Sequence, residues 1–514
     1  MKMDLQVYLD KVHGCWLGKN IGGTLGAPFE CRRGVFDIDF YTHDLTTGVL
    51  PNDDLDLQLI WLHAAEEYGK TVDAKILGEY WLSYIVPNWC EYGAAKNNMA
   101  LGIAPPLSGW YHNHNKDSCG AFIRSELWAC LAPGHPDIAV KYAYEDAIVD
   151  HSDEGVYGEL FCAAIQSAAF SVSDTDTLVS IGLSYIPEDC AVAKAVIEAR
   201  RCYAEGLTWQ EARKKILQLV PGTFGQYIGY EDREPESDVP LGKPGFDTPS
   251  NIGILMIGWL YSEGDIGKGV CIAAGCGEDA DCTAATLGAV LGIIQGADAL
   301  PEKWLAPIGD EIKTICIDLT DSSLKIPASA KELTERICSL MPTFMLGNVS
   351  LKTNPGSVTL ELLEGDALFA VKDERYGHFS TYSLSDRIKR QPTGITAENT
   401  IIDIFVDCID GIDIAPEKEL RFNVQIINKI KKQQWLKIRF ILPEEISVST
   451  GTEFMINMDQ KHGGFGIEEF AFTLLPQAVL QAKYTVIMEV TLTGRHSALY
   501  LPIPLLNNPQ VKRL

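Results

Sequence analysis

The spacing of apolar residues along this chain changes once, near Pro342. Before that point, apolar side chains recur every three or four residues in several segments, which is the period of a helix with one buried face. Turns rich in proline and glycine separate these segments, for example at 104–115 and 240–251. We therefore predict helices within residues 56–68, 125–132, 158–172, 190–206, 209–220 and 250–264.

After Pro342, apolar and polar residues alternate and β-branched residues become frequent, which is typical of half-buried strands. This pattern predicts strands at 357–364, 400–408, 420–427, 434–442 and 484–492. A chain of 514 residues is too long for one ordinary hydrophobic core. We expect two domains: a helical catalytic domain over residues 1–343, and an accessory β-sandwich of seven or eight strands over residues 349–514.

The formal net charge of −26 argues against nucleic acid and anionic membrane surfaces as partners, because both require basic patches. It would also repel a phosphate-bearing substrate unless bound cations reverse the local field. No apolar stretch reaches the roughly 20 residues of a membrane-spanning helix, and the N-terminal stretch lacks the apolar core of a signal peptide. The 14 cysteines include no Cys-x-x-Cys pair. We read them as free thiols in a reducing compartment and expect a cytoplasmic protein.

Two stretches place acidic residues directly before an apolar segment. The first, "PNDDLDLQLIWL", carries Asn52, Asp53, Asp54 and Asp56, and the second, "GCGEDADCTAATLGAVLG", carries Glu278, Asp279 and Asp281. Helix capping explains one such residue per helix, since a carboxylate accepts hydrogen bonds from the first turn. It explains three less well, because like charges in proximity raise one another's pKa.

A bound cation is the second explanation of the acidic stretches, provided that the two stretches meet in space. Carboxylate and amide oxygens are hard ligands that suit Mg²⁺, Mn²⁺ or Ca²⁺ better than zinc. From the residues alone, capping and metal binding stand at about even odds.

An aromatic, proline-rich region is the third feature with possible function. It contains Trp89, Tyr92, Trp110 and Tyr111. These rings could stack on a base or a sugar as part of an active-site lid. A packed surface loop is an equally good explanation.

Five motifs in order along the chain resemble the ADP-ribosylglycohydrolase family, of the dinitrogenase-reductase-activating glycohydrolase type. They lie between residues 11 and 304, and the strand-rich segment is outside the resemblance. The motifs are "GCWLGKNIGGTLGAPFE" ending at Glu30, "NDD" at 52–54, "GAFIR" at 120–124, "VDHSDEGVYGE" around His151, and "GEDADC" at 277–282.

The resemblance implies an orthogonal all-helical fold and a cleft with one or two divalent ions, Mg²⁺ or Mn²⁺. It implies hydrolysis of an ADP-ribosyl or related ribosyl bond by metal-activated water, on a small-molecule or ADP-ribosylated substrate. By position, Glu30 and Asp54 would be catalytic, and Gly120, Arg124 and His151 would contact the substrate. Arg124 could instead pair with an acid, and His151 could cap a helix. The implied metal ligands are Asn52, Asp53, Asp54, Asp279, Asp281, and Cys282 or Thr283.

Two positions depart from the family pattern. Asn52 replaces a threonine, and its amide oxygen is an acceptable ligand. Cys282 stands where a threonine or serine ligand is usual, and thiol sulfur is a poor partner for Mg²⁺. Thr283 is adjacent, but its side chain lies about 100° further around a helix. Cys282 therefore keeps two alternatives open: a non-catalytic ADP-ribose-binding or structural member of the family, and a glycosidase for a different sugar.

Overall fold

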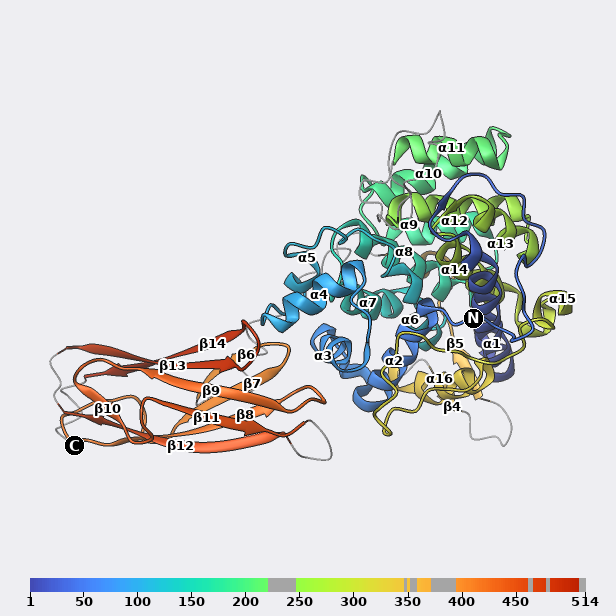
Figure 1. Cartoon of the computed structure of the whole chain (residues 1–514). Helices are drawn as coiled ribbons and strands as arrows, with labels where there is room; N and C mark the ends of the chain where they lie inside the picture. The colour runs from blue at the N-terminus through green and yellow to red at the C-terminus, as the bar shows by residue number, and fades with distance from the viewer. Residues whose placement is uncertain are drawn as a thin grey trace. The chain divides into compact units, whose positions relative to one another are not determined.

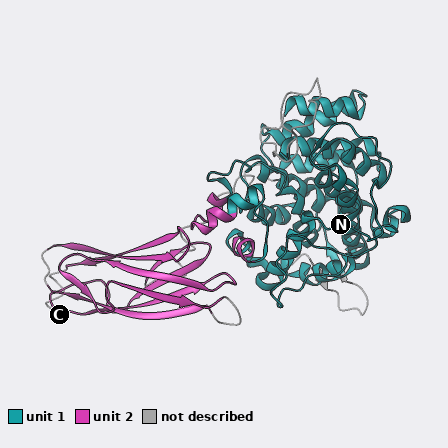
Figure 2. Ribbon diagram, viewed as in Figure 1, with its two compact units in different colours: residues 1–77, 84–95, 109–379 teal, residues 78–83, 96–108, 380–514 magenta. Residues whose placement is uncertain are grey.

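Two compact units make up the chain, and each is considered by itself (Figure 2). Unit 1 comprises residues 1–77, 84–95 and 109–379, and unit 2 comprises residues 78–83, 96–108 and 380–514. The computed structural model describes residues 1–220, 246–345, 349–351, 358–370, 394–460, 466–477 and 481–507.

Unit 1 is built almost entirely of helices (Figure 1). All six segments in which the spacing predicts helices form helices; α10 and α11 bury one face, whereas α6, α8 and α12 are buried almost all round. The longer helices of the chain are α1 (Leu5–Gly26), α2 (Asp53–Tyr68), α3 (Ala74–Tyr84), α4 (Cys90–Ala100), α7 (Pro136–Ala147), α8 (Glu154–Ala168), α9 (Thr175–Ser184), α10 (Ala191–Ala204), α11 (Trp209–Leu219), α12 (Thr248–Ser262), α13 (Ile266–Gly275), α14 (Ala280–Gln295) and α16 (Ala330–Phe344). The short ones are α5 (Leu107–Trp110), α6 (Glu126–Leu131) and α15 (Glu302–Leu305).

The backbones of α1 and α14 touch along a row of small residues. A Cβ atom built on Gly18 would lie 2.0 Å from the carbonyl oxygen of Gly288, and one on Gly22 would lie 2.0 Å from that of Ala284. Gly14 and Gly292 meet in the same way at 2.4 Å. Only glycine permits this approach. The close contact brings the end of α1, just before Glu30, beside the start of α14.

A small antiparallel sheet also belongs to unit 1. It has the order β1–β5–β4, with strands at Lys2–Asp4, Val358–Glu361 and Val349–Leu351. Met3 lies opposite Leu360 in the register of β1 and β5. The division of the chain therefore differs from the boundary expected at 343–349: alternation identifies β5 as a strand, but its partner is the N-terminus of the helical unit.

Unit 2 contains two antiparallel sheets that share one core. Their orders are β10–β12–β8–β7–β6 and β11–β9–β13–β14. The ring centroids of Phe440 in one sheet and Phe472 in the other lie 4.7 Å apart, as expected where two sheets pack face to face. The nine strands described here, where the pattern predicts seven or eight, are β6 (Gly394–Glu398), β7 (Ile402–Cys408), β8 (Leu420–Asn428), β9 (Gln434–Ile441), β10 (Ile446–Val448), β11 (Glu453–Met458), β12 (Ile467–Pro476), β13 (Lys483–Leu492) and β14 (Ala498–Leu506).

Segments from the helical part of the sequence complete unit 2. Leu82 on α3 packs against the core between the two sheets. A Cβ atom built on Gly102 would lie 3.3 Å from the side chain of Asn399 and 3.4 Å from that of Ser497. Residues 78–83 and 96–108 are thus part of the β unit, which the apolar pattern alone does not indicate.

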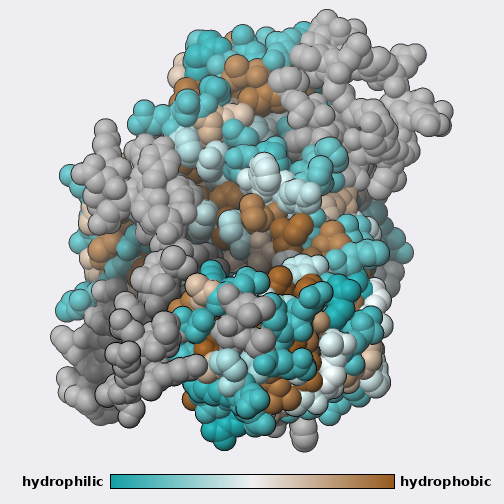
Figure 3. Space-filling model, turned by 90° about the vertical axis from the view of Figure 1, so that its left-hand side faces the viewer, coloured by the Kyte–Doolittle hydropathy of each residue, from teal (hydrophilic) through white to brown (hydrophobic). Residues whose placement is uncertain are grey.

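On the face seen in Figure 3, hydrophilic side chains cover much of the coloured area, with hydrophobic ones between them. Within the described ranges, no helix is both long and apolar enough to span a membrane.

Candidate functional site

The two acidic stretches lie together in unit 1. Asn52 is the N-cap of α2, and its side-chain oxygen accepts a hydrogen bond from the backbone N–H of Asp54 at 2.8 Å. Its amide group donates to Oδ2 of Asp281, at the start of α14, across 3.4 Å. One residue thus connects two helix starts that are 229 positions apart in the sequence.

Two overlapping groups of possible ligands form where these helices begin. The first consists of Asp54, Asp281 and Cys282, and the second of Glu30, Asp279 and Asp281. Within each group, one ligand atom from each residue lies within 4.8 Å of the others. Asp281 belongs to both groups, so the arrangement offers either one site or two adjacent sites.

Several carboxylate oxygens of the cluster are buried without a hydrogen-bond donor. They are Oδ2 of Asp54, Oδ1 of Asp279 and Oδ1 of Asp281, considered against the residues that the structure describes. A buried carboxylate oxygen without a partner is destabilising. Helix capping explains the position of Asn52, but these three oxygens accept no hydrogen bond from a helix start. Their chemistry fits a hard divalent cation, which would supply the missing partner.

The charges in this cluster repel one another. The nearby charge of Asp281 is the largest cause that raises the pKa of Glu30 to about 8, followed by burial and Asp53. Burial, followed by Asp281, raises the pKa of Asp53 to about 6. Burial also raises the pKa of Asp54 and Asp279 well above the usual range, and Asp281 adds to both. Without a cation, the cluster therefore retains protons.

Glu30 reaches the cluster through a short backbone pairing. It follows a 3-10 helix at Ala27–Phe29, and strands β2 (Arg32–Arg33) and β3 (Gly277–Glu278) then pair antiparallel. The N–H of Cys31 donates to the carbonyl of Glu278 across 2.9 Å. This pairing sets Glu30 beside Asp279, with its side chain exposed.

Two other acids of the acidic stretches, Glu278 and Asp56, form hydrogen bonds with distant parts of the chain and do not join the cluster. The carboxylate of Glu278 accepts hydrogen bonds from Arg33 at 2.7 and 3.0 Å. Oδ2 of Asp56 accepts from the backbone N–H groups of Ile315 and Cys316, each at 2.6 Å. Neither residue belongs to the two groups of possible ligands.

Cys282 faces the cluster and Thr283 does not. The thiol of Cys282 donates to Oδ1 of Asp54 across 3.3 Å. The hydroxyl of Thr283 donates to the carbonyl of Ala280 in its own helix, across 3.2 Å. Thr283 therefore does not replace the expected threonine ligand, as its position one step further around α14 anticipates.

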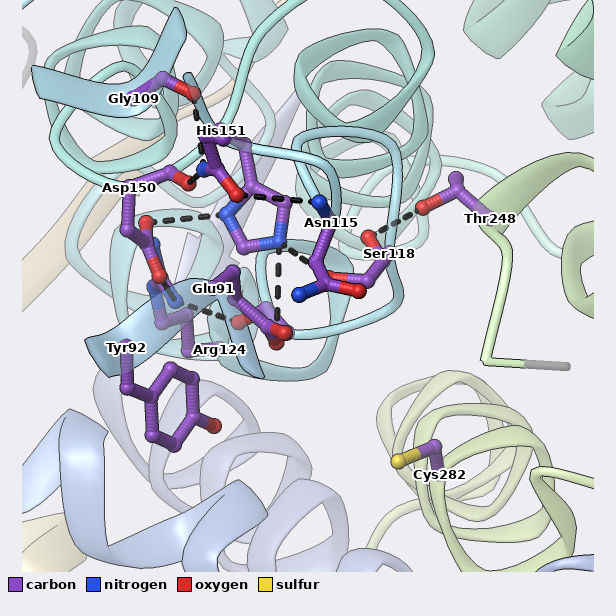
Figure 4. Close-up of polar contacts among 12 residues, drawn as sticks. Glu91, Tyr92, Gly109, Asn115, Ser118, Arg124, Asp150, His151, Thr248 and Cys282 are labelled. Atoms are coloured by element: carbon purple, nitrogen blue, oxygen red, sulfur yellow. Dashed lines mark hydrogen bonds and ion pairs between the residues drawn. The ribbon is translucent and has the colours of Figure 1, made fainter. Parts of the chain in front are cut away.

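Arg124, for which the resemblance implies substrate contact, has a fully buried side chain. It pairs with Asp146 at 2.7 Å. It also pairs with Asp150, at 2.5 Å (Figure 4). The guanidinium group is thus inaccessible to a solute. These ion pairs are the alternative that the sequence leaves open for Arg124, with one acid in α7 and one just after it.

His151 and Gly120 belong to the same buried network. The His151 ring lies 2.9 Å from Asp150 through Nδ1 and 3.1 Å from the hydroxyl of Ser118 through Nε2 (Figure 4). It is 1% exposed, and substrate contact by His151 stays a prediction. A Cβ atom on Gly120 would lie 2.2 Å from Oε1 of Glu91, so the network requires glycine there.

Two polar residues outside the expected set contact the cluster. The hydroxyl of Tyr92 donates to Oδ2 of Asp53 across 3.1 Å, and Oδ1 of Asn251 accepts from the N–H of Asp279 at 3.2 Å. Tyr92 lies on α4 and Asn251 on α12. No local pattern identifies them, because the contacts join distant segments.

The aromatic region divides into buried and exposed rings. Tyr92 is 3% exposed, whereas Trp89, Trp110 and Tyr111 are between 42% and 53% exposed. Trp89 stacks on Tyr92 with ring centroids 6.5 Å apart. This stack sets an exposed indole beside a residue that contacts Asp53.

Comparisons with known proteins found one family and similar solved structures. Residues 4–330 match the family described as ADP-ribosylglycohydrolase. A solved structure described as "ADP-ribosylglycohydrolase-related protein complex" is similar over 66% of this chain and 98% of its own, at 18% sequence identity and a TM-score of 0.42. No curated protein matches. Because the family match spans well over half of its length, the chain belongs to the ADP-ribosylglycohydrolase family.

Proposed function

We propose that this protein is a metal-dependent hydrolase that cleaves an ADP-ribosyl, or a related ribosyl, glycosidic bond with water as the attacking group. Membership of the family supports glycosidic hydrolysis. The observation that carries the metal dependence is the set of three buried carboxylate oxygens without donors, on Asp54, Asp279 and Asp281. Unit 1 would carry all of the chemistry, with the β unit as an accessory.

Asp53, Asp54, Asp279 and Asp281 would hold one or two Mg²⁺ or Mn²⁺ ions, with Asn52 at their edge. A divalent ion bound here would acidify a water molecule and stabilise negative charge on ribose oxygens. Tyr92 and Asn251 would fix the orientations of Asp53 and Asp279 through the hydrogen bonds described above. The oxygen ligands and the net charge of −26 fit a phosphate-bearing substrate only with such cations present.

Glu30 would orient the attacking water and accept its proton. The water oxygen bonds to the anomeric carbon, the bond from that carbon to the leaving group breaks, and the proton passes through Glu30 to the leaving group. Its exposed position leaves its carboxyl group accessible to water, and bound cations would lower its pKa from the value of about 8 that Asp281 and burial give it without them. The exposed rings of Trp89, Trp110 and Tyr111 would stack on a base or a sugar.

The thiol of Cys282 supports one rival function. Its sulfur occupies a position that faces the oxygen ligands, and it would weaken one of two magnesium sites. The rival is a non-catalytic member of the family that binds ADP-ribose without hydrolysing it. A glycosidase for a different sugar would keep the same ligands and differ only in the substrate.

The test is hydrolysis of a substrate panel by the full chain with Mg²⁺ or Mn²⁺. The panel contains ADP-ribosylated arginine and serine peptides, ADP-ribose 1″-phosphate, nucleosides and simple glycosides, and released sugar is measured. Glu30→Gln should lower the rate by about 10²–10⁴-fold while metal and product binding persist. Glu302→Gln, which removes another exposed carboxylate of unit 1, is the matched control and should keep full activity.

The outcomes separate the candidates. Turnover that is unchanged in Glu30→Gln would remove Glu30 from the mechanism. Tight binding of ADP-ribose without turnover of any panel member would favour the non-catalytic function. Hydrolysis of a glycoside alone would identify a different sugar as the substrate.

A further inference from the structure

A pocket lies within unit 2 and shares no residue with the candidate metal centre. Its volume is about 460 Å³, which is within the usual range for small-molecule sites. Three segments supply its walls: the end of α4, the turn between β8 and β9, and the turn between β13 and β14. The lining residues are Asn97, Ala100, Leu101, Lys432, Gln433, Gln434, Thr493, Gly494, Arg495 and His496.

The charged residues of this pocket are all basic. Lys432, Arg495 and His496 line it, and no aspartate or glutamate does. None of these three side chains forms an ion pair within the described part of the chain. Such a set is unexpected in a chain with a net charge of −26, in which acids outnumber bases by 69 to 43.

Arg495 is half-buried, whereas Lys432 and His496 are exposed. Burial lowers the pKa of Arg495, and no carboxylate offsets this effect. Burial, and after it the charge of Lys432, lowers the pKa of Lys96 on α4 to about 8. The positive charges of Lys96 and Lys432 therefore repel each other, and a bound anion would offset this repulsion.

Backbone hydrogen bonds fix the two turns that present the cations. The N–H of Thr493 donates to the carbonyl of Trp435 across 2.8 Å, and that of Arg495 donates to Leu492 across 3.1 Å. Gly494 between them has φ +78°, a conformation that favours glycine. The amide of Asn428 donates to the carbonyl of Lys432 across 2.8 Å. The basic side chains thus start from defined positions, which reduces the entropy lost on binding.

From the volume, the charge and the fixed turns, we propose that this pocket binds a small molecule that carries a phosphate or a similar oxyanion. A guanidinium group, an ammonium group and an imidazole ring line the pocket, and this combination suits the several acceptor oxygens of a phosphate. Asn97, Gln433 and Thr493 add neutral polar groups for the rest of the ligand. A nucleic acid fits less well, because it needs an extended basic surface, whereas these three basic residues line a single pocket of an acidic protein.

The test uses the full chain after removal of metals with a chelator, so that phosphate cannot bind to an ion at the other site. Inorganic phosphate, pyrophosphate and glucose 6-phosphate are titrated by calorimetry, with citrate as a carboxylate probe. Saturable binding of at least one phosphate probe is expected, weakening as salt increases. Preference for citrate would assign the site to carboxylates, contradicting the phosphate assignment.

Substitutions locate the binding. Arg495→Gln and Lys432→Gln should each weaken phosphate binding by about tenfold, because each removes a charge-assisted hydrogen bond. Lys483→Gln is the matched control: it removes an exposed cation from the same strand, β13, at the end opposite the turn, and should change nothing. Lys432 is exposed, so its replacement leaves the fold intact even if that of Arg495 does not.

Two results would overturn the proposal. One is the absence of saturable binding of every phosphate probe at millimolar concentrations. The other is binding that Arg495→Gln and Lys432→Gln leave as strong as in the control, with melting temperatures unchanged. Either result would leave the proposed hydrolase function of unit 1 untouched, because the two sites share no residue.

Discussion

The thiol of Cys282 donates a hydrogen bond to Oδ1 of Asp54 across 3.3 Å. This contact joins the starts of α2 and α14, and Asp281 completes a group of possible ligands with the same two residues. A soft sulfur atom therefore stands among hard carboxylate oxygens, and Oδ2 of the same Asp54 side chain has no partner among the described residues. We therefore expect the affinity of this group for Mg²⁺ to depend on Cys282 and Asp54.

Replacement of Cys282 by threonine should improve Mg²⁺ binding. A hydroxyl oxygen is a better ligand for a hard cation than sulfur. We expect about tenfold tighter binding, which is at the lower end of the changes in metal affinity caused by substitutions near a bound ion. Calorimetric titration of the metal-free chain measures it. Cys282→Ala, which removes the sulfur without adding oxygen, should not tighten binding. Equal affinities for wild type and Cys282→Thr would place the residue outside the metal's contacts.

Asp54→Asn should abolish or strongly weaken divalent metal binding, because it removes a charged oxygen from the centre of the cluster. Asp56→Asn is a stringent control, since Asp56 lies two residues away but accepts hydrogen bonds from Ile315 and Cys316 instead. It should lower stability and keep metal binding. In wild type, metal at one hundred times its dissociation constant should stabilise the fold by about 2.7 kcal/mol. If no divalent ion raises the melting temperature, the orphaned oxygens have another explanation.

The stability of the metal-free chain should fall as pH rises. The pKa of Glu30 is raised from its ordinary 4.5 to about 8, chiefly by Asp281. A carboxyl group with a higher pKa in the folded than in the unfolded chain binds more protons when folded. Its contribution to stability is therefore complete below the unfolded pKa and is lost as pH rises through the folded one. Glu30→Gln should flatten the decline of the melting temperature between about pH 4.5 and about pH 8.

Saturating Mg²⁺ provides the control for this pH dependence. Positive charge in the cluster offsets the repulsion between Glu30 and Asp281, so the metal-loaded chain should lose less stability over the same pH range. Scanning calorimetry at a series of pH values, with and without the ion, makes the comparison. A slope that is the same in wild type and Glu30→Gln would show that Glu30 does not carry this linkage.

Gly18→Ala should destabilise unit 1 by about 1–3 kcal/mol or more, because the added methyl group would lie 2.0 Å from the carbonyl oxygen of Gly288 and force the helices apart. It should also weaken metal binding, since the packing of α1 on α14 holds Glu30 beside Asp281. Gln6→Ala, at an exposed position of the same helix, should stay within about 0.5 kcal/mol of wild type. Chemical unfolding measures both variants. A Gly18→Ala chain as stable as the control would exclude this close approach.

The sequence by itself predicts six of the helices and five of the strands. The segments with helical spacing form α2, α6, α8, α10, α11 and α12, and those that alternate form strands. This succeeds because the spacing of apolar residues is a local property of the chain, whatever the element packs against. The crowding of Asp53, Asp54, Asp279 and Asp281 before two helices is also visible in the sequence, as is the possibility of a cation among them.

Only the tertiary structure decides which residues meet. It turns Glu278 towards Arg33 and Asp56 towards Ile315, although both stand in the same motifs as the cluster acids. It buries Arg124 between two aspartates and pairs β5 with the N-terminal strand. Tyr92 joins the candidate site from a different helix. The spacing of apolar residues indicates which side chains are buried. The partner of a buried side chain depends on packing between segments that are far apart in the sequence, and no local pattern records it.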